Sequence, residues 1–277
     1  MKGYCPRIRI HAEGGALLVR DGVNFTFYMP RPHREVAQQV WTSLEAYVGA
    51  VGAGALGVYA DEDGQWQKLD AAAWADVRRE LLSDAQLLFD LSDASAAENR
   101  YRFIYWGKPA GLSAGAVSAV SFWLPSEFLE EHGPERVRQL ALKLAAPLPF
   151  SSGHAGLAFH AEIDVMGVER KVRELSVRYP AMDIPDPSLL SFKLGTRVKG
   201  VHWLTFLGQP VLGALGGAAG LRARLKSPGT TVQEMAGERA VVTLGEWPDA
   251  GDTEQGHGLP ASYQELARVL EPWFYLE

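Results

Sequence analysis

The chain of 277 residues has a single cysteine and no long apolar run. Cys5 by itself can form neither an internal disulfide nor a thiolate zinc site, which fits a reducing compartment. The opening MKGYCPRIRI lacks the apolar core of a signal peptide, and charge or proline interrupts every longer apolar stretch well short of the roughly 20 residues that span a bilayer. We therefore expect a soluble, cytoplasmic protein without membrane contact.

Nucleotide-binding motifs are missing as well. The segment 198–217, VKGVHWLTFLGQPVLGALGG, has no Lys-Ser or Lys-Thr after its glycines, and their spacing does not fit the dinucleotide fingerprint. We expect no cofactor. The segment predicts core scaffolding instead: a strand with Val201, Trp203 and Thr205, a break at Gly208, a short helix burying Val211, Leu212 and Leu215, and a left-handed C-cap at Gly216 and Gly217.

Catalytic and metal-binding patterns are incomplete. An extended HAEID run places His160, Glu162 and Asp164 on one strand face, which could hold a metal, but the apolar residues of the other face predict that this polar face meets solvent. Ser113 in GLSAG fits the five-letter nucleophile pattern, yet it precedes a strand and opens no helix. The seven histidines show no ligand pair. We therefore expect no metal site and no catalytic residue.

Negative charge is concentrated in two parts of the chain, whose net charge is −6. Residues 61–98 carry ten acidic residues against three basic ones, and residues 245–277 carry seven against Arg268. Residues 165–230 have the opposite balance of charge, with ten Lys or Arg and four acidic residues. This distribution disfavours direct binding of nucleic acid and favours a basic partner, although solvated acidic faces would give the same pattern.

Hydrophobic periodicity predicts an α+β fold. Asp21-Gly22 lies between two apolar runs and predicts a two-residue hairpin turn. Residues 33–52 and 70–84 have the apolar spacing of helices, with Asp70 as an N-cap. Strands are expected at 23–30 before the first helix, at 55–60 after it, where the chain returns, and near 99–106.

The second half repeats this order. A strand near 116–125, a helix at 134–148 and a strand near 155–164 precede a helix at 165–180, a small antiparallel meander from 219 to 248 and a closing helix at 263–274. A strand–helix–strand unit thus occurs twice. We expect two related lobes with mostly antiparallel sheets, 1–110 and 111–277, fused into one globular unit.

The segments RYPAMDIPD and GVHWLTFLGQPVLGALGG resemble the TsiV family of bacterial type VI secretion immunity proteins, and the likeness extends from about Asp21 to Pro248. It is carried mainly by Arg178-Tyr179-Pro180, Trp203-Leu204, Leu207-Gly208 and Leu215-Gly216-Gly217. The resemblance implies an antitoxin that binds and neutralises a cognate toxin encoded by an adjacent gene. For characterised relatives it implies a VRR-Nuc nuclease whose DNA-binding surface is covered. It implies no catalytic residues.

Two acidic surfaces are the expected partner contacts, because a nuclease holds its polyanionic substrate on a basic surface. One is the turn Asp61-Glu62-Asp63 with Trp66 as an aromatic anchor, and the other is the loop with Asp249, Asp252 and Glu254. Two alternatives stay open: a small-molecule or nucleic-acid hydrolase that uses the His160/Glu162/Asp164 face or Ser113, and a phage-derived structural or adaptor protein.

Overall fold

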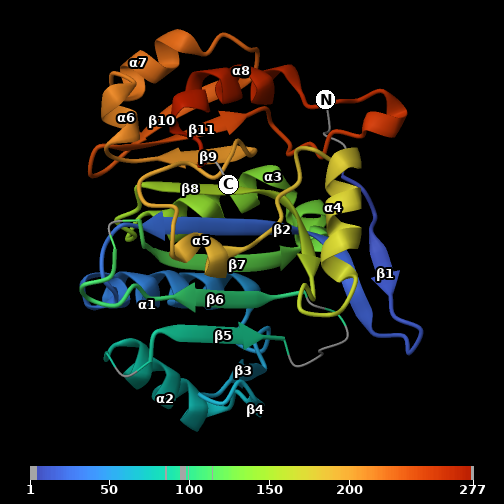
Figure 1. Ribbon diagram of the computed structural model, residues 1–277, viewed down its shortest axis with the longest axis vertical. Coiled ribbons are helices and arrows are strands. Elements are labelled where there is room, and N and C mark those ends of the chain that lie inside the picture. Colours follow the sequence, from blue (N-terminus) through green and yellow to red (C-terminus); the bar gives the residue numbers. More distant parts are fainter. Residues whose placement is uncertain (1–4, 85, 94–97, 99, 114, 276–277) are drawn as a thin grey trace.

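A computed structural model describes residues 5–84, 86–93, 98, 100–113 and 115–275. Its centre is one 11-stranded sheet in the order β10-β11-β9-β8-β2-β7-β6-β5-β3-β4, with β1 added to β2. Every pair of neighbouring strands is antiparallel. Figure 1 shows the strands stacked along the long axis of the molecule, with β10 and β11 near one end and β4 at the other. The α+β class is confirmed.

The strands in chain order are β1 Arg9–His11, β2 Leu17–Met29, β3 Val58–Ala60, β4 Trp66–Lys68, β5 Leu88–Ser92, β6 Arg102–Trp106, β7 Ser118–Pro125, β8 Ser152–Ala161, β9 Leu204–Leu207, β10 Thr230–Met235 and β11 Arg239–Leu244. The helices are α1 His33–Val51, α2 Ala71–Leu81, α3 Ser126–Ala145, α4 Val168–Arg178, α5 Pro187–Ser191, α6 Val211–Ala214, α7 Gly217–Arg224 and α8 Ala261–Leu270, with 3-10 turns η1 Thr253–Gln255 and η2 Glu271–Trp273. None of the helices in these ranges has the length and apolar character required to cross a bilayer.

Both faces of the central strands of the sheet are covered. Helices α1 and α3 pack on one face, here called the back face, and the short α5 lies on the other, the front face (Figure 1). Strand β2 shows the division, since side chains of a strand alternate between faces. Phe25 and Phe27 belong to the large core under α1 and α3, whereas Tyr28 packs with Leu190 of α5. The central strands are therefore buried on both sides.

The hairpin predicted at Asp21-Gly22 is wrong, because β2 runs straight through these residues. Gly22 pairs with Pro125 of β7 on one side and Ala158 of β8 on the other. A Cβ at Gly22 would lie 2.2 Å from Cε1 of His160, so this glycine is required by a close approach and not by a turn. Asp21 is fully buried, and its carboxylate accepts hydrogen bonds from the backbone of Ile8 and from Ser126.

The glycine-rich segment 198–217 is core scaffolding, as the sequence indicates. Val211, Leu212 and Leu215 are all buried at α6, and both Gly216 and Gly217 have positive φ. The predicted strand is displaced, since β9 begins only at Leu204. The meander predicted from 219 is also partly wrong: residues 217–224 form α7, because the two positive-φ glycines start a new helical turn, and only β10 and β11 form the hairpin.

The sheet is continuous across the boundary expected between residues 110 and 111. Strand β6 pairs with β7, and β2 of the first half lies between β7 and β8 of the second. The return strands also differ in place: β3 is near one edge of the sheet, whereas β8 is central. The two halves therefore share one sheet and one large core.

Candidate functional site

The front face carries a buried polar cluster, defined here as Asn24, Ser121, His154, Asp183, Lys199 and His202. Strand register brings its sheet members together, since Thr26 pairs with both Ser121 and His154. Asp183 comes from the connection after α4 and forms a parallel bridge with Ala158 of β8. Gly156 leaves room for the segment with His202, whose Cβ lies 3.6 Å from where a Cβ on the glycine would be.

The Asp183 carboxylate is the centre of this cluster. Its Oδ2 lies 2.9 Å from Nε2 of His154 and accepts a hydrogen bond of 2.9 Å from the Asn24 amide. Its Oδ1 accepts a 2.5 Å bond from Nζ of Lys199, which also donates to the carbonyl of Ile184 at 2.6 Å. The buried carboxylate thus has an opposite charge and two further donors, as burial of an ion requires.

The cluster is arranged to hold Asp183 ionised and both histidines neutral. Burial by itself would raise the pKa of Asp183, but Lys199 and His154 hold the pKa of that carboxyl well below its usual range. Burial lowers the pKa of His154 despite the neighbouring carboxylate, and it lowers the pKa of His202 further. Because an ionised carboxylate only accepts, Nε2 of neutral His154 carries the proton and donates it.

Three members of the cluster have the composition of a metal site. One ligand atom each from His154, Asp183 and His202 lies within 4.8 Å of the other two. Lys199, however, already neutralises Oδ1 of Asp183, and a divalent ion would have to displace its ammonium group. The two imidazole rings are stacked, with centroids 4.2 Å apart. The polar cluster is therefore a structural anchor: its hydrogen bonds and ion pair hold the connection formed by residues 178–203 against the sheet.

We expect the two buried histidines to make stability fall in mild acid. Unfolded histidine takes up a proton near pH 6.5, while His154 and His202 resist it in the folded state, so the free energy of unfolding should fall by up to about 2.7 kcal/mol per pH unit below that value. The low pKa of Asp183 adds stability that persists through this range and is lost only at lower pH. Denaturant titrations at pH 7.5, 6.0 and 5.0 measure the slope. His202→Gln should reduce the slope by about 1.4 kcal/mol per pH unit, and a slope equal to that of the unchanged protein would contradict the assignment.

The polar face predicted on HAEID does not exist as a solvent-exposed surface. His160 is fully buried, and its ring stacks on Trp123 with centroids 4.3 Å apart and planes at 14°. Strand β8 ends at Ala161, so Glu162 and Asp164 lie beyond it and do not share its face. The His160 ring is enclosed instead between Trp123 and Gly22, where an added Cβ would lie 2.2 Å from Cε1 of His160. The burial predicted for the other face holds for Leu157, Phe159 and Ala161.

Ser113 lies on an exposed turn. Its backbone carbonyl accepts from Ala116 at 3.0 Å, and β7 follows it. The strand-to-helix turn of a nucleophile elbow is therefore not formed here, as its sequence context indicates.

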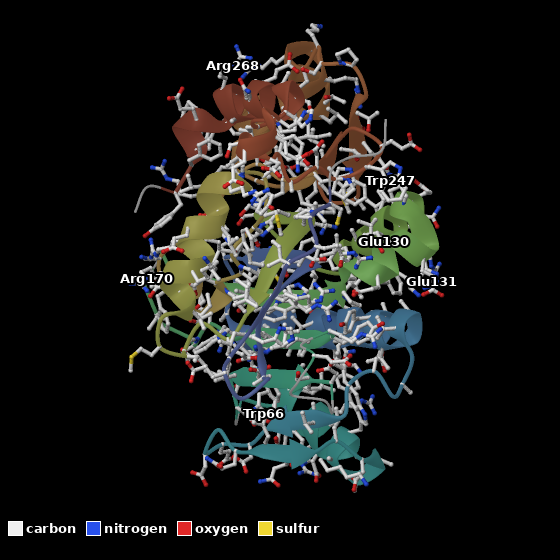
Figure 2. All side chains as sticks on the ribbon, turned by 90° about the vertical axis from the view of Figure 1, so that its right-hand side faces the viewer. Trp66, Glu130, Glu131, Arg170, Trp247 and Arg268 are labelled. Carbon is white, nitrogen blue, oxygen red and sulfur yellow. The ribbon has the colours of Figure 1, made fainter. Side chains whose placement is uncertain are left out.

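The two predicted acidic surfaces are far apart. Trp66, half exposed, begins β4 at one end of the molecule, and the 249–254 loop lies near α4 and α8 in the other half (Figures 1 and 2). Glu62 and Asp63 are exposed, while the Asp61 carboxylate accepts from the backbone of Asp63 and Gln65 and so shapes the turn.

In the second surface the three acids have different environments. Asp252 is fully buried and holds the guanidinium of Arg178 through two 3.0 Å bonds. Glu254 is exposed and pairs with the same arginine. Asp249 is half-buried and accepts from the backbone of Gly251. Asp252 therefore supports the loop, and Glu254 is the most exposed acid.

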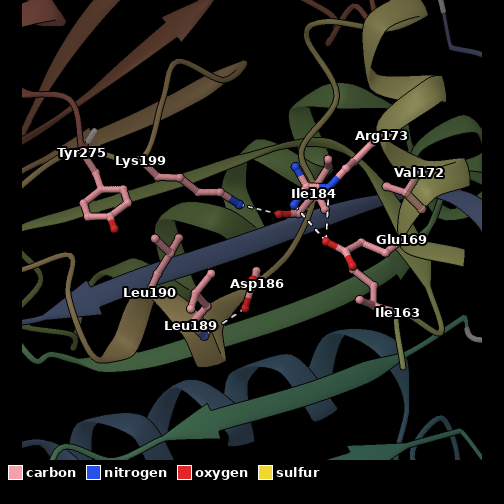
Figure 3. Close-up of a pocket in the computed structure, with 10 residues that line it drawn as sticks. All are labelled: Ile163, Glu169, Val172, Arg173, Ile184, Asp186, Leu189, Leu190, Lys199 and Tyr275. Atoms are coloured by element: carbon pink, nitrogen blue, oxygen red, sulfur yellow. Dashed lines mark hydrogen bonds and ion pairs between the residues drawn. The ribbon is translucent and has the colours of Figure 1, made fainter. Parts of the chain in front are cut away.

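A groove on the front face was not predicted. One cavity of about 410 Å³ lies between α4, α5 and Tyr275, and Figure 3 shows Lys199 reaching across it toward Ile184. A second cavity, also of about 410 Å³, lies over β5, β6 and β7. Both are walled by Ile163, Asp186 and Leu189, so together they form one feature, here called the front groove. Its residues come from segments about 100 positions apart, which no local spacing could indicate.

Comparisons with known proteins agree with the fold described above. The Pseudomonas aeruginosa T6SS protein PA0821 is similar in structure, with a TM-score of 0.80 and 21% sequence identity over 99% of this chain and 78% of that one. Among curated proteins, none matches the chain. The family model described as TsiV, type VI immunity for VRR-NUC, matches residues 39–277. Because this match covers most of its length, the chain belongs to the TsiV family of type VI immunity proteins.

Proposed function

We propose that this protein is a cytoplasmic antitoxin that binds a cognate secreted nuclease and covers the surface on which that nuclease holds nucleic acid. The observation that carries the proposal is the match to a type VI immunity family over residues 39–277. The proposed partner is a toxin encoded by an adjacent gene. The protein acts by occlusion and breaks no bond of the toxin.

Charge supports this role. The net charge is −6, and a nuclease binding a polyanion presents a basic surface. Complementary fields accelerate association, which suits an antitoxin that must act before the toxin does. In this proposal the turn at Asp61, Glu62, Asp63 and Trp66 and the loop with Asp249 and Glu254 contact the toxin, and Asp252 holds the loop in place.

Co-expression tests the proposal directly. Induction of the toxin from the adjacent gene should stop growth, and production of this protein should restore it. With purified proteins, a stable complex should form and cleavage of DNA should cease. Unchanged lethality and unchanged cleavage in the presence of the folded protein would refute the role.

Charge reversal tests the acidic surfaces separately. Glu62→Lys with Asp63→Lys, or Glu254→Lys, should slow association about tenfold and flatten its dependence on salt. Asp61 and Asp252 are left unchanged because their carboxylates hold backbone or Arg178 in place. Glu131→Lys on α3 is the control, and stopped-flow kinetics at several salt concentrations is the measurement. An unchanged rate would place that surface outside the interface.

A further inference from the structure

The strands at the two ends of the sheet differ in how they are covered. At one end α7 packs beside β10 (Figure 1), and Arg222 of that helix donates a 2.9 Å hydrogen bond to the carbonyl of Val232. A strand edge that is occupied in this way is protected from pairing with another chain. At the other end β4 is the last strand, and all three of its residues are exposed.

Two hydrogen bonds fix the pattern of pairing between β3 and β4. The N–H of Asp61 donates to the carbonyl of Gln65 at 2.9 Å beside the turn, and the N–H of Leu69 donates to the carbonyl of Gly57 at 2.8 Å at the far end. Residues opposite each other in antiparallel strands alternate between pairs that are hydrogen-bonded and pairs that are not. Counted from either end, only the middle residue of β4 directs its main-chain groups toward β3.

The main-chain groups of Trp66 and Lys68 therefore point away from β3, while those of Gln67 pair with Tyr59. Within the part of the chain that the structure describes, no other strand pairs with this side of β4, and no hydrogen bond from a loop or turn reaches it. Two N–H and two C=O groups are thus presented along one free edge. An extended segment of another chain can pair with such an edge.

The side chains around this edge indicate which segment fits it. Trp66 is 50% exposed, and a half-exposed indole is typical of the residues that contribute most to protein contacts. Glu62 and Asp63 are exposed at the turn that leads into β4, and neither has a basic partner among the described residues. A strand that carries a basic residue near this turn is therefore attracted to the edge.

A second copy of this chain fits the edge poorly. Two β4 strands paired antiparallel about Gln67 would bring the turn with Glu62 and Asp63 of each copy near Asp70 of the other. Like charges placed opposite each other on neighbouring strands repel. The charge around β4 thus favours a basic strand over a copy of itself.

We infer that β4 receives a strand of the toxin as a further strand of the sheet. The main-chain groups of Trp66 and Lys68 pair with that strand, and a basic residue of it lies beside Glu62 and Asp63. This inference rests on the proposed function and gives the contact at this surface a mode of binding. Main-chain pairing supplies affinity, whereas the indole and the acidic turn select the side chains of the incoming strand.

Replacing Lys68 by proline tests the main-chain contact. Proline removes the N–H that points to the free edge and places its ring there, but it removes no hydrogen bond to β3. The Kd for the toxin from the adjacent gene should rise at least about tenfold. The matched control is Lys68→Ala, which keeps the N–H, and its Kd should stay within about threefold. Urea unfolding should show both variants folded.

Amide hydrogen exchange of the unchanged protein gives a second measurement. In the free protein the amides of Trp66 and Lys68 should exchange fast, and that of Gln67 should exchange more slowly because it pairs with β3. In the complex, exchange at Trp66 and Lys68 should slow at least about tenfold, because both N–H groups are then hydrogen-bonded. Nuclear magnetic resonance follows the three amides separately.

The outcomes separate this inference from the antitoxin role. If the unchanged protein binds the toxin but exchange at Trp66 and Lys68 does not slow, or if folded Lys68→Pro binds as tightly, the inference is overturned and the antitoxin role stands. If Glu62→Lys with Asp63→Lys weakens binding while exchange stays fast, the turn contacts the toxin without strand pairing, which also overturns the inference. A dimer of the free protein with slow exchange at these amides would assign the edge to a second copy instead. If the unchanged protein does not bind the toxin, both proposals fail.

Discussion

Replacing Asp183 by asparagine is expected to lower the free energy of unfolding by about 3–5 kcal/mol. The substitution removes the anion while Lys199, whose side chain is 19% exposed, keeps its charge. It also places an amide NH₂ among groups that donate to the carboxylate, those of His154, Asn24 and Lys199. Urea unfolding followed by circular dichroism measures the loss.

Two further variants separate charge from packing. Asp183→Asn combined with Lys199→Met should recover part of the loss, because no uncompensated cation stays in the cluster. Asp76→Asn is the matched control: its carboxylate also pairs with a basic side chain, that of Arg79, but on an exposed helix surface, where such a pair contributes less than about 1 kcal/mol. A loss at Asp183 no larger than at Asp76 would contradict the anchor role.

The sequence predicted the longer helices, though not α5 or α7, and the class of the fold, because each of these predictions depends on local periodicity. α1 and α2 follow the apolar spacing at 33–52 and 70–84, and Asp70 does cap α2 through the backbone of Ala72 and Ala73. The order of strands in the sheet could not be predicted in this way, since it depends on pairings between distant segments such as β2 with β8. The insertion of β2 between β7 and β8 has no local signal.

The errors at Asp21-Gly22 and at HAEID have a related cause. Asp-Gly and alternating HAEID are patterns of exposed structure, but here both lie in central strands, where Gly22 is paired on both sides and the His160 ring is packed on Trp123. The signal was the small residues: Gly156 and Ala158 lie between His154 and His160 on β8, and Gly22 lies beneath the His160 ring. Small residues at alternate positions indicate that another segment approaches closely. Alternation of polar residues by itself does not show whether a strand face is exposed to solvent or buried.

The anchor and the front groove are physically linked. Asp183 binds the 178–203 connection to β8, and Asp186, three residues on, caps α5 through the backbone of Leu189. Both Asp186 and Leu189 line the groove, so the polar cluster holds part of its wall in place.

Replacing Trp203 by alanine is expected to lower the free energy of unfolding by about 3–5 kcal/mol through the cavity it leaves. Trp203 is 1% exposed, and its indole donates a 3.1 Å hydrogen bond to the carbonyl of Gly245, which joins the segment before β9 to the end of β11. Trp203→Phe should recover most of the packing but not this hydrogen bond. Its free energy of unfolding should therefore lie between those of the unchanged protein and Trp203→Ala.

The control for this prediction is Trp66→Ala. Trp66 is 50% exposed at the edge strand β4, so its removal should change the free energy of unfolding by less than about 1 kcal/mol. If Trp66 contacts the toxin, the same variant should weaken the complex. Trp203 would then be required for stability of the fold, and Trp66 for binding of the toxin. Guanidinium unfolding of all three variants measures the difference, and equal losses at Trp203 and Trp66 would refute the scaffold role of the 198–217 segment.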